Sequence, residues 1–200
     1  FEQAIEQSTA PSGDFDPLFF DNAMQGSLRH SALTLWLLGY PDQARQRMNA
    51  ALELSSQNAR SIRYAMTLYF AAMLHHYMGE TDGVELRAEE IKSLASIHGY
   101  AYHQVSGPLF GAWVLARQGE SKGVAQMRQL LEVRKANGHR LFLPYEMGLS
   151  AEAYLLEARS TEGLAVLKDA LTIVTETGEY VWQAELLRLE AELLAIHGAS

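Results

Sequence analysis

The sequence predicts an all-α protein, an α-α superhelix made of about four helical hairpins and a terminal capping helix. The first observation is a short pattern that returns at a constant interval, at positions 37–44, 77–84, 117–124 and 157–164. The second is an independent series of glycines with almost the same interval, at positions 99, 138 and 178. Self-similarity at a period of about 20 to 50 residues is typical of solenoids, in which neighbouring repeats supply each other's core.

Each copy of the pattern has the features of a turn between two helices. A long apolar segment runs into Gly39, Gly79 or Gly119, and glycine can take the left-handed conformation that closes a helix. The fourth copy has Arg159 at this place, so we expect a different turn there. A small or branched apolar residue follows each turn, and we expect it to pack against the first helix of the hairpin: Ala44, Val84, Val124 and Leu164.

We interpret the chain as a single helical-repeat domain. The expected parts are a truncated preceding repeat and loop at 1–20, repeats at 21–59, 60–99, 100–138 and 139–178, and a capping helix at 179–200. The predicted helices are 21–38, 41–56, 60–78, 82–98, 100–118, 121–136, 141–158, 161–177 and 180–196. Pro108 lacks a backbone donor, so we expect it to kink or delay its helix. Because the sequence starts with Phe1 and not Met, we expect it to be a piece of a longer protein.

Composition and charge exclude several classes of function. A formal charge of −8 with scattered Lys and Arg argues against binding nucleic acid through its phosphates. The absence of Cys excludes disulfides and thiolate metal sites, and it agrees with a reducing cytoplasm. No apolar run approaches the roughly 20 residues that a bilayer-spanning helix needs. We therefore expect a cytoplasmic protein with no membrane contact.

The sequence also lacks the patterns of an active site. A phosphate-binding loop ends in Gly-Lys-Ser/Thr, and the segment Ser121-Lys122-Gly123 has the reverse order. His75 and His76 are adjacent, and adjacent helical positions point about 100° apart, which does not suit one metal ion. We expect no enzyme activity, no cofactor and no metal site.

The hairpins resemble tetratricopeptide repeats. That family places a small residue inside the first helix, a turn glycine, and small residues about five and twelve positions after it. The residues at these positions are Ala32, Gly39, Ala44 and Ala51; Ala72, Gly79, Val84 and Ile91; Ala112, Gly119, Val124 and Leu131. After the second and third turns, Val, Ile and Leu replace the family's small residues. The interval between the turn glycines is longer than the family's usual period. Segments 35–44 and 184–194 are similar to the longer repeats of bacterial ATPase-linked nucleotidyl cyclases and large transcriptional regulators.

This resemblance implies a right-handed superhelix whose first helices line a concave groove. The groove positions of the family are counted back from each turn glycine, at offsets of thirteen, ten, six, three and two. In this sequence they are Arg29, Leu33, Trp36, Met66, Tyr69, Met73, His76, Tyr77, Leu109, Trp113 and Arg117. Aromatic, Met and Arg side chains are favoured at binding hot spots. The alternative is that Trp36, Tyr69 and Trp113 fill the core between helices.

The function that follows is a non-catalytic scaffold within a larger signalling or transcriptional regulator. It would bind a protein or peptide partner, including other domains of the same polypeptide, and no nucleic acid. A small-molecule sensor, in which the aromatic residues close over a metabolite, is the alternative.

Overall fold

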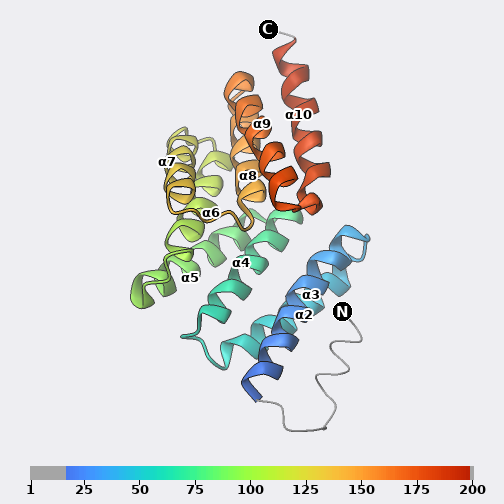
Figure 1. Cartoon of the computed structure of the whole chain (residues 1–200), viewed down its shortest axis with the longest axis vertical. Helices are drawn as coiled ribbons and strands as arrows, with labels where there is room; N and C mark the ends of the chain where they lie inside the picture. The colour runs from blue at the N-terminus through green and yellow to red at the C-terminus, as the bar shows by residue number, and fades with distance from the viewer. Residues whose placement is uncertain (1–16, 199–200) are drawn as a thin grey trace. The chain divides into compact units, whose positions relative to one another are not determined.

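The protein is helical throughout the part that the structure describes. The computed structural model describes the backbone of residues 17–198 and the side chains of residues 23–198, so most of the predicted segment 1–20 lies outside the described residues. No strand occurs within residues 17–198. The helices, labelled as in Figure 1, are α2 (Pro17–Leu37), α3 (Pro41–Ser56), α4 (Ile62–Tyr77), α5 (Thr81–His98), α6 (His103–Arg117), α7 (Lys122–Ala136), α8 (Leu143–Leu156), α9 (Ser160–Thr177), a short 3-10 helix η1 (Tyr180–Trp182) and α10 (Gln183–His197).

The helices lie close to where the sequence predicts them. Helix α3 has the predicted bounds, and α5 begins only one residue before the predicted start. The first helix, α2, begins at Pro17, whereas the sequence predicts a start at residue 21. Helix α6 begins at His103, three residues after the predicted start at residue 100, and it continues through Pro108. The all-α class is therefore confirmed for the described residues.

Two sets of glycines have the left-handed backbone that the sequence predicts. Gly39, Gly79 and Gly119, which join the two helices of a hairpin, have φ angles of 84°, 71° and 82°. The glycines that end the second helices have φ angles of 70°, 69° and 76°, at positions 99, 138 and 178. A residue with a Cβ atom is strained in this region, which explains why glycine recurs at these places.

The fourth turn has the same geometry as the others but closes one residue earlier. Ala158 takes the left-handed conformation there, with a φ of 54°. The amide of Arg159 then donates to the carbonyl of Tyr154 at 2.9 Å. The amide of Glu80 makes the same bond to the carbonyl of His75 after Gly79. The prediction of a different turn around Arg159 was wrong, because an alanine occupies the place of the glycine.

The earlier closing of the fourth turn also changes which residue packs under it. Ala44, Val84 and Val124 are buried, as predicted for the residue early in each second helix. Leu164 is partly exposed, whereas Gly163 is buried. The one-residue shift moves Gly163 into the place that Val124 has in the third hairpin.

The chain forms two compact units, Phe1–Gly107 and Pro108–Ser200, where the sequence was interpreted as one array. The division falls inside α6, next to its proline. A proline within a helix removes one backbone hydrogen bond and weakens the helix at that point.

In the first unit, each helix packs on its neighbours in the sequence. Helices α2 and α3 pair as one hairpin, α4 and α5 pair as the next, and α4 also contacts both helices of the preceding hairpin. Side chains about one period apart join the hairpins. Arg45 on α3 forms an ion pair with Glu80 at 2.7 Å, and the hydroxyl of Tyr100 donates to the carbonyl of Arg60.

The second unit has the same pattern. Helix α8 pairs with α9 and contacts α7, and α10 packs on both α8 and α9. Helix α7 lies very close to α6, since a Cβ atom on Gly123 would be 2.5 Å from the carbonyl oxygen of Ala112. A buried ion pair joins α7 to α8, with Arg134 Nε and Nη2 donating to the two carboxylate oxygens of Glu146 at 2.8 and 2.7 Å.

Candidate functional site

Several of the predicted groove residues belong to the core. Leu33, Tyr69, Met73, Leu109 and Trp113 are all buried. The ring of Tyr69 packs against Phe70, Tyr102 and His103 within the first unit. These side chains fill the space between helices, as the alternative interpretation of the aromatic residues expects for Tyr69 and Trp113. A partner could contact them only if the helices moved apart.

The other predicted groove residues remain accessible. Arg117 is exposed, and the rest are partly buried: Arg29, Trp36, Met66, His76 and Tyr77. The guanidinium of Arg29 lies 5.4 Å from the centroid of the Phe70 ring and forms no ion pair among the described residues. Burial lowers the pKa of Arg29 below its ordinary value, because the charged form is desolvated. The rings of His76 and Tyr77 lie next to each other, with centroids 5.4 Å apart.

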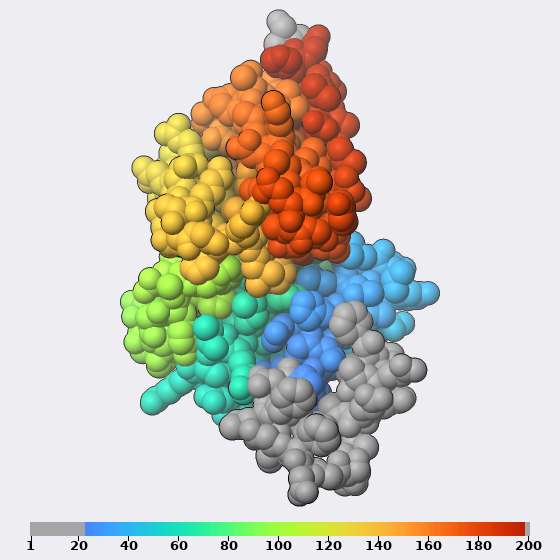
Figure 2. All heavy atoms as spheres, viewed as in Figure 1, coloured from blue at the N-terminus to red at the C-terminus, as the bar shows by residue number. Residues whose placement is uncertain are grey.

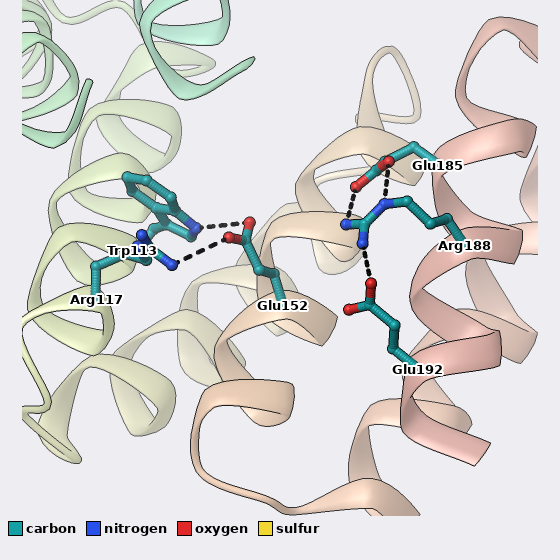
Figure 3. Close-up of polar contacts among 6 residues, drawn as sticks. All are labelled: Trp113, Arg117, Glu152, Glu185, Arg188 and Glu192. Atoms are coloured by element: carbon teal, nitrogen blue, oxygen red, sulfur yellow. Dashed lines mark hydrogen bonds and ion pairs between the residues drawn. The ribbon is translucent and has the colours of Figure 1, made fainter. Parts of the chain in front are cut away.

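In the second unit, three side chains from two first helices meet at an accessible polar contact (Figure 3). The indole N–H of Trp113 donates to Glu152 Oε2 at 3.1 Å. Arg117 Nη1 lies 3.9 Å from Glu152 Oε1, and its guanidinium is 5.8 Å from the Trp113 ring. Trp113 itself is buried, but the Arg117 and Glu152 side chains are 39% and 21% exposed. The buried indole therefore orients a carboxylate that solvent can reach.

Helix α10 contributes a second accessible cluster (Figure 3). Arg188 Nε and Nη2 donate to the two oxygens of Glu185 at 2.8 and 2.6 Å, and Nη1 donates to Glu192. The hydrogen bonds that Arg188 donates to Glu185 raise the pKa of Arg188 above its ordinary value. All three side chains are between a third and a half exposed. We call the accessible residues of both clusters the polar strip: Arg117, Glu152, Glu185, Arg188 and Glu192.

Four residues of the polar strip were missed by the sequence analysis. Glu152 lies at the offset of six before Ala158, while Glu185, Arg188 and Glu192 lie at offsets of thirteen, ten and six before Gly198. These are the same offsets that define the predicted groove. The fourth hairpin was passed over because its turn has no glycine, and α10 because it was taken as a cap. The offsets counted back from Gly198 would have identified the three residues of α10, whereas Glu152 is found only once the structure shows the turn at Ala158.

A further polar cluster holds the second turn in place. Glu80 bonds to Arg45 at 2.7 Å and to His75 Nδ1 at 2.7 Å, while the His75 ring packs against Gly83 at the start of α5. The hydrogen bond from Arg45, followed by that from His75, lowers the pKa of Glu80 to about 2. The cluster ties three helices of the first unit together, so we assign it to stability.

Other classes of site find little support in the described residues. A hollow of about 600 Å³ lies at the second turn against His75, Glu80 and Asp82, and a cavity of about 40 Å³ between α7, α8 and α9 has room for a water molecule. Among the described residues, no three His, Cys, Asp or Glu side chains are grouped so that they could hold a metal ion. Within the same residues, no helix is both long and apolar enough to span a membrane.

No model of a known protein family matches the chain, and a search among curated proteins finds no match. Function must therefore be inferred from the geometry. Guanidinium and carboxylate groups on neighbouring first helices can form charge-assisted hydrogen bonds with a polar segment laid across them. The polar strip is thus suited to binding.

Proposed function

We propose that the chain is a non-catalytic helical-repeat module that binds a protein or peptide segment across its first helices. The observation that carries this proposal is the position of the polar strip. Its side chains belong to α6 and α8, the first helices of successive hairpins, and to α10, and Glu152 accepts a hydrogen bond from the buried Trp113. A preformed row of polar groups lowers the conformational entropy that is lost when a partner binds.

The chemistry of the strip favours a partner with basic residues. Three of its members are carboxylates, Glu152, Glu185 and Glu192, and two are guanidiniums. The whole chain has a formal charge of −8, which attracts positively charged segments over a distance. Carboxylates accept hydrogen bonds from Lys, Arg and backbone N–H groups, whereas Arg117 and Arg188 can donate to the carbonyls of the same segment.

The wider setting of the module follows from its resemblance to tetratricopeptide arrays. The similarity of segments 35–44 and 184–194 to the longer repeats of bacterial regulators supports a place in a larger cytoplasmic regulator. The repeat period and the turn glycines support stacking of the helices as a right-handed superhelix. In such a protein, binding of the segment would change the placement of attached domains. The full open reading frame tests the proposed place in a larger regulator, because it shows whether other domains are attached to this module.

Binding is tested with an array of peptides that vary in Lys and Arg content, followed by titration of the best peptide. We expect Arg117→Gln and Glu152→Gln to weaken binding at least tenfold each, since both side chains would contact the peptide. Glutamine at position 152 can still accept the Trp113 N–H, so the fold is expected to stay intact by circular dichroism. Trp113→Ala is not used because it would open a cavity in the core.

Matched substitutions on a second helix serve as controls. Arg128→Gln and Glu132→Gln change the same residue types at exposed positions of α7, outside the polar strip. We expect both controls to bind like the wild type. If the strip variants fold and bind no more weakly than the α7 variants, the proposed surface is wrong.

A further inference from the structure

Helices α8 and α10, which carry most of the polar strip, pack side by side and run in the same direction. In the first half of each helix, a Cβ atom on Gly148 would be 3.2 Å from Cδ2 of Leu186. Toward the other end, Tyr154 of α8 and Leu193 of α10 both lie against Gly163 of α9. The starts of the two helices are therefore at one end of the pair, and their C-terminal turns are at the other.

Two carboxylates of the strip, those of Glu152 and Glu192, lie at nearly the same height on this pair of helices. The residues that make the two contacts are separated by almost one repeat interval, and Glu192 follows Glu152 by one full interval. In Figure 3 the cluster of α10 extends from its helix on the side of Glu152. Residues at one height on packed helices are separated by about the distance between the axes, about 8–10 Å.

Both carboxylates can accept a hydrogen bond from a partner. The side chains of Glu152 and Glu192 are 21% and 47% exposed. Oε2 of Glu152 accepts the Trp113 N–H, and Oε1 of Glu192 accepts from Arg188. A carboxylate has two oxygens with about four acceptor positions, so these bonds leave room for more. The pair thus suits two basic side chains on one side of a segment, about 8–10 Å apart.

The spacing of the carboxylates discriminates between backbone conformations of the segment. In a polyproline II helix, residues i and i+3 lie on the same side and are about 9 Å apart. In a β-strand, residues i and i+2 share a side but are only about 7 Å apart. An α-helix places i and i+7 on one face about 10 Å apart, but its carbonyls are used in internal hydrogen bonds. A polyproline II backbone keeps its carbonyls available to the guanidiniums of Arg117 and Arg188.

We infer that the segment bound by the polar strip is a polyproline II segment with two basic residues three positions apart, which contact Glu152 and Glu192. This inference rests on the proposed function and specifies the conformation and the spacing of its partner. Prolines between the basic residues would lower the entropy that is lost on binding, because they hold the backbone in this conformation. Figure 2 shows the red atoms of α10 at the outer border of the second unit, so the segment can extend past α10 into solvent.

The test compares labelled peptides by fluorescence anisotropy. Three peptides have the same composition, with two Arg, two Pro and four Gln, blocked ends, and Arg at i and i+2, i and i+3, or i and i+4. A fourth is an Ala-rich helical peptide with Arg at i and i+7. We expect the i, i+3 peptide to bind at least tenfold more tightly than the others.

The two carboxylates are tested with Glu152→Gln and Glu192→Gln. Each variant should lower the affinity for the i, i+3 peptide to that of the other spacings, since only one carboxylate remains. Glu132→Gln on α7 is the matched control and should keep the preference, and circular dichroism checks that all three variants fold.

The outcomes separate this inference from the proposed function. If all four peptides bind the wild type equally and bind Glu152→Gln more weakly, the spacing is wrong and the proposed function stands. Tightest binding of the i, i+2 or the i, i+7 peptide would also overturn the inference, because the bound segment would then be a strand or a helix. If no peptide distinguishes the wild type from Glu152→Gln and Glu192→Gln, the proposed surface is wrong and the inference fails with it.

Discussion

Removing one half of the buried ion pair between α7 and α8 should be among the most damaging single changes in the second unit. The Arg134 and Glu146 side chains have no exposed surface, and two hydrogen bonds of 2.8 and 2.7 Å join them. In Glu146→Gln the side chain keeps its size but loses its charge. The guanidinium of Arg134 then stays buried and loses the charge of the carboxylate to which it donates two hydrogen bonds.

The expected magnitude follows from the loss of that carboxylate charge. Breaking a buried pair typically costs about 3–5 kcal/mol, because the remaining ion cannot regain its hydration. Total stabilities of domains are about 5–15 kcal/mol, so the loss is a large fraction of the whole. With an m value of about 2 kcal/mol/M, the urea midpoint should fall by roughly 2 M. Replacing both partners, as in Arg134→Met with Glu146→Leu, should be nearly neutral or stabilising.

Urea unfolding followed by tryptophan fluorescence can isolate the second unit. The chain has three tryptophans, and the substitution Trp36→Phe leaves Trp113 and Trp182, which both belong to the second unit. Glu176→Gln is the control. It removes an ion pair with Arg140 in which both side chains are about half exposed. We expect the control to cost at most about 1 kcal/mol. The reasoning is refuted if Glu146→Gln costs no more than Glu176→Gln, or if the double substitution is the most damaging of the set.

Three other changes test the turns and the close helix contacts. Ala158→Gly should stabilise the second unit by about 0.5–1 kcal/mol, since glycine relieves the strain of a positive φ; a lower urea midpoint would contradict this. Gly123→Ala should destabilise by about 1–3 kcal/mol in the same assay, because a Cβ atom would lie 2.5 Å from the backbone oxygen of Ala112. The pKa of Glu80 is lowered from 4.5 to about 2, so the stability it contributes is present above pH 4.5 and lost as the pH falls toward 2. Glu80→Gln should therefore make the melting temperature of the first unit less dependent on pH between pH 4.5 and 2. An unchanged slope of melting temperature against pH would show that the contact with Arg45 is unimportant for stability.

The fold class and the helix ends could be predicted because they depend on local chemistry. Gly39, Gly79 and Gly119 mark the turns through a backbone conformation that only glycine adopts without strain. The fourth turn was misread because Ala158 accepts that strain, and nothing in a single sequence signals an alanine with a positive φ. Because the turn residue is Ala158 and not residue 159, the buried position early in the second helix also lies one residue earlier. The sequence analysis therefore assigned that position to Leu164 instead of Gly163.

The accessible surface was harder to predict because burial depends on neighbours. The offset of six before the turn gave Met73 and Trp113 as groove residues, but both are buried. Periodicity defines which face of a helix a residue occupies. It does not say whether that face is open, since the distance to the next first helix depends on the side chains of both. Glu152 and Glu192 show that the same offset also reaches accessible positions, in hairpins that the sequence analysis passed over.

The residues at this one offset change from apolar to charged along the chain. From the first hairpin to α10 they are Leu33, Met73, Trp113, Glu152 and Glu192. The first three are buried and apolar, so they stabilise the units to which they belong. The last two carry charge at partly exposed positions, where a carboxylate contributes little to stability. Under the proposed function, binding should be more sensitive to changes in α8 and α10 than in α2 and α4.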